Sequence, residues 1–262
     1  MRVHVVSDVH GNAEALARAG DGADALIVLG DLLNFVDYHD HAGGILGRLF
    51  GPEKVATFAE LRRGKQAAAT SVFVRTLWAG LADAAEQVEE AIREQYAGLF
   101  AALSTPTYAI PGNVDVPALW PEFARDGIHL LDGQTTDIGG LRFGFVGGAT
   151  LRPGQVLRRT GVWVPYLRTE EEFADSVAAL GPVDVLCSHV PPALPELTYD
   201  VIARRPELGS PALLKAILKH HPRWSVFGHV HQPLAMRLRL GHTECVNVGH
   251  FQRTGVPHAL SW

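Results

Sequence analysis

The stretch Ser7-Asp8-Val9-His10-Gly11-Asn12 follows directly on a short apolar run, residues 3–6. It places a carboxylate and an imidazole two residues apart, where a strand-like run breaks into a glycine. Both side chains can face one cation, because carboxylate oxygens and imidazole nitrogens are common ligands of divalent metals. An Asp-x-His pattern alone is common in proteins, so its meaning depends on the rest of the chain.

Four later segments repeat the arrangement, each with a metal-type side chain at the end of an apolar run. They are Gly30-Asp31, Gly112-Asn113-Val114-Asp115, Ser188-His189 and Gly228-His229-Val230-His231. Taken singly, each has an ordinary explanation: Asp8 could cap a helix, and Asp31 or Asn113 could occupy a turn. His189 alone would be read as a hydrogen-bonded core histidine. Five such segments together favour one shared site over five separate coincidences.

In order and context, the five segments resemble the motifs of the calcineurin-like metallophosphoesterase family. The resemblance implies an α/β sandwich, in which helices flank central β-sheets, with a dinuclear metal site. One metal would take Asp8, His10, Asp31 and His231, and the other would take Asp31, Asn113, His189 and His229. Such mixed carboxylate, amide and imidazole ligation suits Mn, Fe, Co or Zn better than Ca or Mg. A metal-bridging hydroxide would then attack the phosphorus.

One position departs from the family pattern. Most highly active members of the family carry a histidine directly after the asparagine of the third motif, which is Asn113 here. This chain has Val114 at that position. In the family the acidic residue at the position of Asp115 orients that histidine, so we expect Asp115 to support Asn113 or a water molecule instead. Because valine cannot donate a proton, the sequence predicts slow hydrolysis that is easiest on aryl phosphodiesters. The candidate replacement proton donors are His39, His41 and His250.

The N-terminal third predicts a parallel sheet covered on both faces. Residues 3–6 are apolar apart from His4, residues 25–29 are a continuous apolar run, and Asn12 is a good cap for a helix over residues 12–20 between them. Ligands in such sheets gather at the carboxyl ends of the strands. Further strands are predicted at residues 107–110, 128–131, 141–146, 183–187 and 224–227, with a closing hairpin of residues 235–240 and 244–248. Thr169 with Glu172 forms a capping box for a helix to residue 180, and Ser210-Pro211 opens another helix.

Residues 38–104 interrupt this pattern. Apolar residues recur there at steps of three, four and seven, which predicts a short helix at 52–61 and a long, intact or broken helix at 66–103. We interpret the segment as a helical insertion in a single domain of residues 1–262, acting either as a partial lid or as a cover for the sheet. A second, irregular excursion at about 150–168 carries four arginines that could clamp a distal phosphate or lie in solvent: Arg152, Arg158, Arg159 and Arg168.

Composition narrows the classes of function. Hydrophobic content of 47% and charged content of 19% are typical of a globular protein, and a net charge of -5 argues against nucleic acid as a partner. The two cysteines suggest no disulfide framework, and without a signal peptide or membrane span we expect a cytoplasmic protein. The sequence therefore predicts a phosphodiesterase or phosphatase for a small phosphorylated molecule. The alternatives are a catalytically weak metal-binding scaffold of the same fold, or a nuclease.

Overall fold

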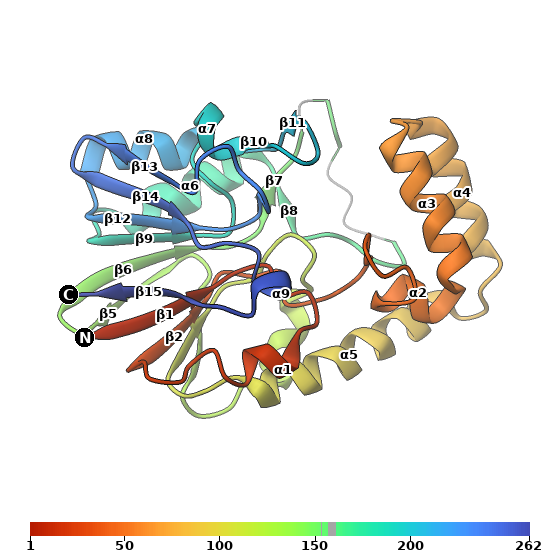
Figure 1. The fold of residues 1–262 in the computed structure, drawn as a ribbon, viewed down its shortest axis with the longest axis horizontal. Helices are drawn as coiled ribbons and strands as arrows, with labels where there is room; N and C mark the ends of the chain where they lie inside the picture. Colours follow the sequence, from red (N-terminus) through yellow and green to blue (C-terminus); the bar gives the residue numbers. More distant parts are fainter. Residues whose placement is uncertain (153, 157–160) are drawn as a thin grey trace.

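The computed structural model describes residues 1–152, 154–156 and 161–262. Two β-sheets pack face to face, and helices cover their outer faces (Figure 1). The first sheet has the order β15-β1-β2-β3-β4, in which β1 to β4 are parallel and β15 is antiparallel to β1. Its strands are β1 (Arg2–Val6), β2 (Ala25–Val28), β3 (Thr107–Ala109), β4 (Ile128–Leu130) and β15 (His258–Ser261).

The second sheet has the order β13-β14-β12-β9-β6-β5. Four central strands, β14, β12, β9 and β6, are parallel, and the two edge strands are antiparallel to their neighbours. Its strands are β5 (Gln134–Ile138), β6 (Leu141–Val146), β9 (Val185–Ser188), β12 (Trp224–Phe227), β13 (Arg237–Leu240) and β14 (Thr243–Asn247). The predicted α/β sandwich is confirmed in this arrangement.

The apolar runs form strands because both of their faces are buried. Val3 and Val5 of β1 pack between the two sheets, whereas Val6 faces the outer core that the helices cover. In β2, Ile27 joins the inner core and Leu26 the outer one. A parallel strand covered on both faces carries continuous rather than alternating apolar residues, which explains the runs seen in the sequence.

Helices form the outer layers. The first sheet is covered by α1 (Ala13–Leu16) and α5 (Ala84–Ala102), and the second by α6 (Glu170–Leu180) and α8 (Pro211–His220). The capping box of Thr169 and Glu172 is present at the start of α6, as predicted. The predicted helix at residues 12–20 is shorter than expected, because α1 ends at Leu16 and turns follow it.

The helical segment differs in detail from the prediction. The long helix is divided into α4 (Ala67–Ala79) and α5, since Gly80 ends α4 and Asp83 adopts a left-handed φ of 47°. The short predicted helix is present as α3 (Pro52–Arg63), and α2 (Gly44–Phe50) precedes it. Figure 1 shows the α3–α4 hairpin standing away from the sheets, and no residue of α4 is buried. The division into a domain and an insertion, and the action of a lid, stay predictions.

The second excursion begins and ends in a small parallel pair, β7 (Ala149–Thr150) and β8 (Leu167–Arg168). Arg158 and Arg159 lie outside the described residues. Arg152 donates to Glu207 at 2.6 Å, and Arg168 lies 3.7 Å from Asp132. Both described arginines of the predicted clamp are thus paired with carboxylates of the protein itself.

Five elements after residue 194 and one edge strand escaped the sequence analysis. The edge strand β5 has four exposed or half-buried polar residues before Ile138, so it has no apolar run. After residue 194, β10 (Tyr199–Asp200) pairs with β11 (Arg205–Pro206), α7 (Pro195–Thr198) precedes them, and α9 (Phe251–Thr254) leads into β15. Among the described helices, none is both long enough and apolar enough to cross a membrane.

The capping box of α6 allows a direct test of the local fold. Thr169 accepts a hydrogen bond from the Glu172 amide at 3.1 Å, so Thr169→Ala leaves a helix-terminal donor without its partner. We expect the free energy of unfolding to fall by about 1 kcal/mol, measured by urea denaturation. Thr57→Ala is the control, because Thr57 is exposed in the interior of α3. Equal losses in both variants would contradict the role of the cap.

Candidate metal centre

The seven predicted ligands all lie at one edge of the sandwich. Asp8 and His10 follow β1, Asp31 follows β2, and Asn113 follows β3 in the first sheet. In the second sheet, His189 follows β9 directly, and the segment with His229 and His231 follows β12. Since both sheets direct the carboxyl ends of these parallel strands to this edge, side chains more than 200 residues apart meet.

The backbone at this edge adopts conformations that L-residues seldom occupy. Asp8, His10, Asp31 and His229 have φ values of 57°, 40°, 52° and 67°, and only four other non-glycine residues in the described chain have positive φ. Each such conformation costs roughly 1 kcal/mol or more, and it persists only where the surrounding structure imposes it. The strain is therefore concentrated at the predicted site.

Close backbone approaches explain the glycines of the motifs. A Cβ atom at Gly112 would lie 2.1 Å from Oδ1 of Asp31, and one at Gly228 would lie 2.4 Å from Oδ2 of Asp8. Such contacts are far inside van der Waals distance, so any side chain would push the strand ends apart. The sequences Gly-Asn and Gly-His thus reflect how tightly the loops of the two sheets meet.

Asp8, His10 and His231 form one group of ligand-type atoms. Nε2 of His231 lies 3.3 Å from Oδ1 of Asp8, and Nε2 of His10 lies 3.9 Å from the same oxygen. The two Nε2 atoms are 3.4 Å apart. Oδ1 of Asp8 is buried and has no hydrogen-bond partner among the described residues, whereas Oδ2 accepts from the His229 amide. A buried, unpartnered carboxylate oxygen facing two imidazole nitrogens fits a cation site.

Asp31, Asn113 and His189 form a second group beside the first. Nε2 of His189 lies 3.5 Å from Oδ2 of Asp31 and 3.1 Å from Oδ1 of Asn113. The same Asp31 oxygen lies 4.0 Å from Nε2 of His10, so it faces both groups. The His229 ring stands edge-on to His189, with 5.1 Å between centroids.

Two of the histidines are oriented by backbone carbonyls. Nδ1 of His10 lies 3.0 Å from the carbonyl oxygen of Leu33, and Nδ1 of His189 lies 2.8 Å from that of Leu29. A carbonyl only accepts, so Nδ1 carries the hydrogen and Nε2 presents its lone pair to the site when the ring is neutral. This is the outer support that metal-binding histidines commonly have.

Burial and neighbouring charges shift the pKa values of the predicted ligands. Burial disfavours the charged form of His189, but the Asp31 carboxylate outweighs it and raises the pKa of His189 to about 9. Burial and the neighbouring His189 lower the pKa of His229 to about 4. Burial would raise the pKa of Asp8, yet the surrounding imidazoles hold it well below its usual range. The two carboxylates therefore attract positive charge into a buried position.

A family comparison agrees with this geometry. Residues 1–233 match the family model described as calcineurin-like phosphoesterase, which spans all seven of the predicted ligands. The chain belongs to the calcineurin-like phosphoesterase family. Members of this family are metal-dependent hydrolases, so the donor set at the strand ends is the kind that the family's chemistry requires. No curated protein matches the sequence.

Solved structures share the fold of this phosphoesterase at low identity. TT1561 from Thermus thermophilus is 16% identical, covers 99% of this chain and 98% of its own, and has a TM-score of 0.56. A second structure is 17% identical, covers 96% of this chain and 91% of its own, and has a TM-score of 0.60. A candidate 5'-nucleotidase from Staphylococcus aureus, solved with alpha-ketoglutarate, reaches 0.44 at 14% identity over 95% of this chain and 48% of its own. The first two likenesses agree with the fold alone.

In this phosphoesterase, Asp115 joins the loops that follow β2 and β3. Its buried carboxylate accepts from the backbone amides of Leu32 and Leu33 after β2, and from Gly112 after β3 at 2.8 Å. The Tyr96 hydroxyl on α5 donates to it at 3.2 Å. Burial and the charge of Asp31 raise the pKa of Asp115 to about 6. Asp115 thus fastens the Asp31 loop to the Asn113 loop, and Tyr96 ties both to α5.

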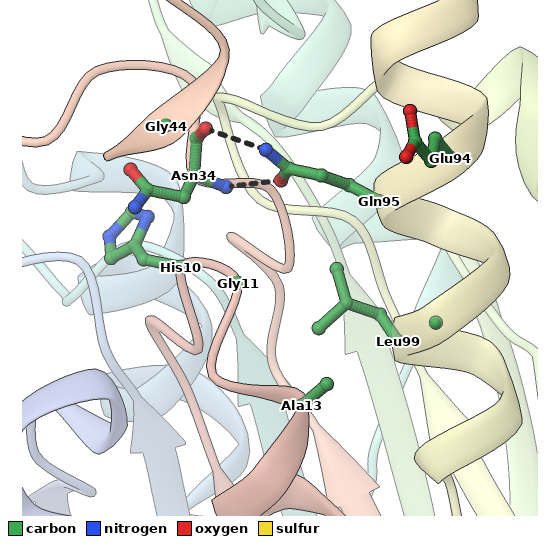
Figure 2. A pocket seen from close by; sticks show the side chains of 9 residues that line it. His10, Gly11, Ala13, Asn34, Gly44, Glu94, Gln95 and Leu99 are labelled. Carbon is green, nitrogen blue, oxygen red and sulfur yellow. Dashed lines mark hydrogen bonds between the residues drawn. The ribbon is translucent and has the colours of Figure 1, made fainter. Parts of the chain in front are cut away.

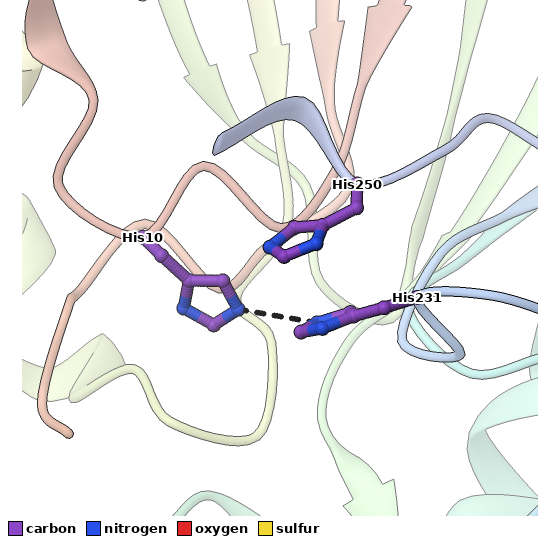
Figure 3. A group of neighbouring side chains, drawn as sticks. All are labelled: His10, His231 and His250. Atoms are coloured by element: carbon purple, nitrogen blue, oxygen red, sulfur yellow. Dashed lines mark hydrogen bonds between the residues drawn. The ribbon is translucent and has the colours of Figure 1, made fainter. Parts of the chain in front are cut away.

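Of the candidate proton donors, only His250 lies against the described site. Its ring stacks on His231 with 3.7 Å between centroids and 19° between planes (Figure 3). One ring nitrogen from each of His10, His231 and His250 lies within 4.8 Å of the other two, although the nearly parallel rings of His231 and His250 direct their lone pairs along separate planes. Within the described chain, no hydrogen bond or ring contact joins the imidazoles of His39 or His41 to the seven predicted ligands.

Gln252 is a residue that the sequence analysis missed. Its amide nitrogen donates to the carbonyl of His10 at 3.1 Å and to Asp37 at 3.3 Å. Its amide oxygen is therefore free to accept from Nε2 of His250, 3.2 Å away. Gln252 connects the stacked His250 to the His10 loop, and no residue pattern in its neighbourhood signals this.

The charge of His189 predicts a pH dependence for the metal-free protein. Its folded-state pKa of about 9 exceeds the value of 6.5 expected without partners. The folded state then holds the proton more tightly, so this stabilisation is complete below pH 6.5 and is lost as the pH rises through 9. We expect the free energy of unfolding to decline by up to about 1.4 kcal/mol per pH unit in that window.

His189→Gln is the matched variant for this test, since an amide retains hydrogen bonding but cannot carry the charge. Urea denaturation of both proteins in chelator at several pH values measures the slope. An unchanged slope in His189→Gln would contradict the assignment of the proton to His189.

Proposed function

We propose that this phosphoesterase hydrolyses a phosphodiester or phosphomonoester of a small molecule with two divalent metal ions. The observation that carries the proposal is the position of Oδ2 of Asp31. It lies 4.0 Å from Nε2 of His10 and 3.5 Å from Nε2 of His189, between the two groups of ligand-type atoms. An oxygen with this environment suits a bridge between two ions.

The proposed ligand sets follow the two groups. One ion is assigned to Asp8, His10, Asp31 and His231, and the other to Asp31, Asn113, His189 and His229. Oδ1 of Asp31 accepts from the Val114 amide at 2.9 Å. The bridge is therefore assigned to Oδ2 alone, and the Val114 amide holds the carboxylate in that orientation.

The donor set guides the choice of metal. It combines carboxylates, an amide and four imidazoles, which favours Mn, Fe, Co or Zn over Ca or Mg. When bound, such a pair of ions supplies an activated water and neutralises charge on the phosphoryl oxygens. The chain's own contribution is to hold the Nδ1 atoms of His10 and His189 on the carbonyls of Leu33 and Leu29, so that the Nε2 atoms point inward.

Proton donation to the leaving group is the weak point of the proposed chemistry. Val114 packs its half-buried side chain against the outer core of the first sheet and offers no proton. His250 is held by Gln252 and stacks on His231, so a role as donor stays a prediction, as it does for His39 and His41. The reaction is therefore expected to depend strongly on how readily the leaving group departs without a proton.

Metal restoration tests the proposal. The protein is stripped with chelator, loaded separately with Mn, Fe, Co, Ni, Zn or Mg, and assayed on bis(4-nitrophenyl) phosphate and 4-nitrophenyl phosphate. We expect turnover to return with one or more of the transition metals, and two ions per chain by metal analysis. Asp31→Ala should lower turnover by about 10³-fold or more, because it removes the proposed bridge and leaves buried imidazoles without a counter-charge.

Asp137→Ala is the control for that variant, since Asp137 is exposed on β5 and pairs with Arg142 at the start of β6, away from the carboxyl ends of the strands. Two bound ions with no turnover on either ester would favour the scaffold alternative. A protein that binds no metal under any of these conditions would contradict the ligand assignment.

The leaving-group dependence is a separate prediction. Without a positioned acid, we expect the rate on aryl esters to exceed that on alkyl esters by at least the roughly 10²–10⁴-fold that general acid catalysis supplies. A series of phosphate esters with leaving-group pKa values from 7 to 15 measures the slope. His250→Ala is assayed in parallel, and a steeper slope in that variant would identify His250 as the donor and contradict the expectation.

A further inference from the structure

A cavity of about 350 Å³ lies between the His10 loop and α5 (Figure 2). Its size is at the lower end of the range for small-molecule sites. Nine residues line it, and they come from the loop after β1, α1, the loop after β2, α2 and α5. They are His10, Gly11, Ala13, Asn34, Gly44, Glu94, Gln95, Gly98 and Leu99. His10 belongs both to this wall and to the proposed metal centre, so the two are adjacent.

The cavity is built on a hydrogen-bonded frame. The side-chain oxygen of Gln95 accepts a hydrogen bond from the backbone amide of Asn34 at 3.0 Å. The side-chain nitrogen of Gln95 donates to the backbone carbonyl of Asn34 at 3.1 Å, as Figure 2 shows. The Asn34 side-chain nitrogen donates to Asp37 at 3.0 Å. These bonds use both ends of the Gln95 amide and the donor end of Asn34, which leaves the Oδ1 acceptor of Asn34 without a hydrogen bond inside the described chain.

The wall offers no unpaired cation to a second anion. Glu94 supplies a carboxylate, and its Oε2 pairs with Arg48, which is not among the lining residues. Apart from His10, the lining residues include no basic side chain. The unused groups are therefore mainly acceptors, Oε1 of Glu94 and Oδ1 of Asn34, which suit hydroxyl hydrogens.

Gly98 keeps the cavity open. It lies on the exposed face of α5, and a Cβ atom built there would meet no heavy atom within 4 Å. Glycine in the interior of a helix costs roughly 1 kcal/mol relative to alanine, so its presence in α5 has a local cost that no packing contact explains. The space that it leaves faces the same side of the helix as Glu94 and Gln95.

We infer that this cavity binds the organic group of the substrate, and that this group is an uncharged, hydroxyl-bearing polyol or sugar. The inference rests on the proposed function, because the phosphate itself is assigned to the adjacent metal centre. Asn34 and Glu94 accept from the hydroxyl groups, and the open space at Gly98 admits the ring or chain. The insertion thereby determines specificity from its α5 end.

Binding to the metal-loaded protein tests the inference by calorimetry, with glucose 6-phosphate, inorganic phosphate and fructose 1,6-bisphosphate as probes. We expect glucose 6-phosphate to bind at least tenfold more tightly than inorganic phosphate. The bisphosphate should lose that advantage, because Arg48 is already paired with Glu94 and the wall offers the second phosphate no unpaired cation. Glu94→Gln leaves Arg48 without its carboxylate partner and should restore tighter binding of the bisphosphate.

Gly98→Leu fills the cavity with a residue that favours helix, so the fold is expected to persist. The variant should weaken the binding of glucose 6-phosphate tenfold or more, while the affinity for inorganic phosphate and the metal content stay unchanged. Ala97→Leu is the matched control, because Ala97 is the exposed neighbour on α5 that does not line the cavity. It should change neither affinity.

The outcomes separate the two proposals. Equal affinity of the wild-type protein for glucose 6-phosphate and phosphate, or equal effects of Gly98→Leu and Ala97→Leu, would overturn the cavity assignment and leave the metal centre standing. Failure of inorganic phosphate to bind the loaded protein would overturn the proposed function, and this inference with it.

Discussion

Two carboxylates, Asp8 and Asp31, are buried where the strand ends of the two sheets meet. Much of the local structure compensates their negative charge. Burial of like charges is costly unless positive charge or hydrogen-bond donors compensate it. The backbone amides of His229 and Val114 each donate to one oxygen of the pair. The remaining oxygens face imidazoles, so the centre is arranged to hold cations. The left-handed backbone at both aspartates is the local cost of this convergence.

The helical segment is part of this construction at its α5 end. Tyr96 donates to Asp115, which in turn holds the loops after β2 and β3 together. The residue before it, Gln95, accepts from the Asn34 amide and donates to the Asn34 carbonyl. By contrast, no residue of α4 is buried. The two parts of the segment therefore have different physical roles, since α5 completes the core and the walls of the site while the α3–α4 hairpin stands apart.

Sequence patterns predicted the central strands because their physical cause is local. A strand buried on both faces is apolar along most of its length, as β2 is throughout and β1 is apart from Arg2 and His4. Other elements have no such local cause in the sequence, so they were not predicted. The edge strand β5 is half exposed and carries no apolar run, and the break between α4 and α5 depends on Asp83 adopting a conformation that its sequence does not demand. Gln95 and Gln252 carry no signal, because their amides act only on partners brought close by folding.

The sequence by itself determined the parallel α/β architecture, and the resemblance of its five motifs supplied the ligand set. Only the tertiary structure decided how those ligands meet, which Asp31 oxygen faces both groups, and that His250 stacks on His231. It also decided the cavity beside His10. The physical reason is separation along the chain: the contact of His189 with the Leu29 carbonyl joins residues 160 positions apart. Local propensity specifies each strand, whereas the packing of two sheets specifies which strand ends share a site.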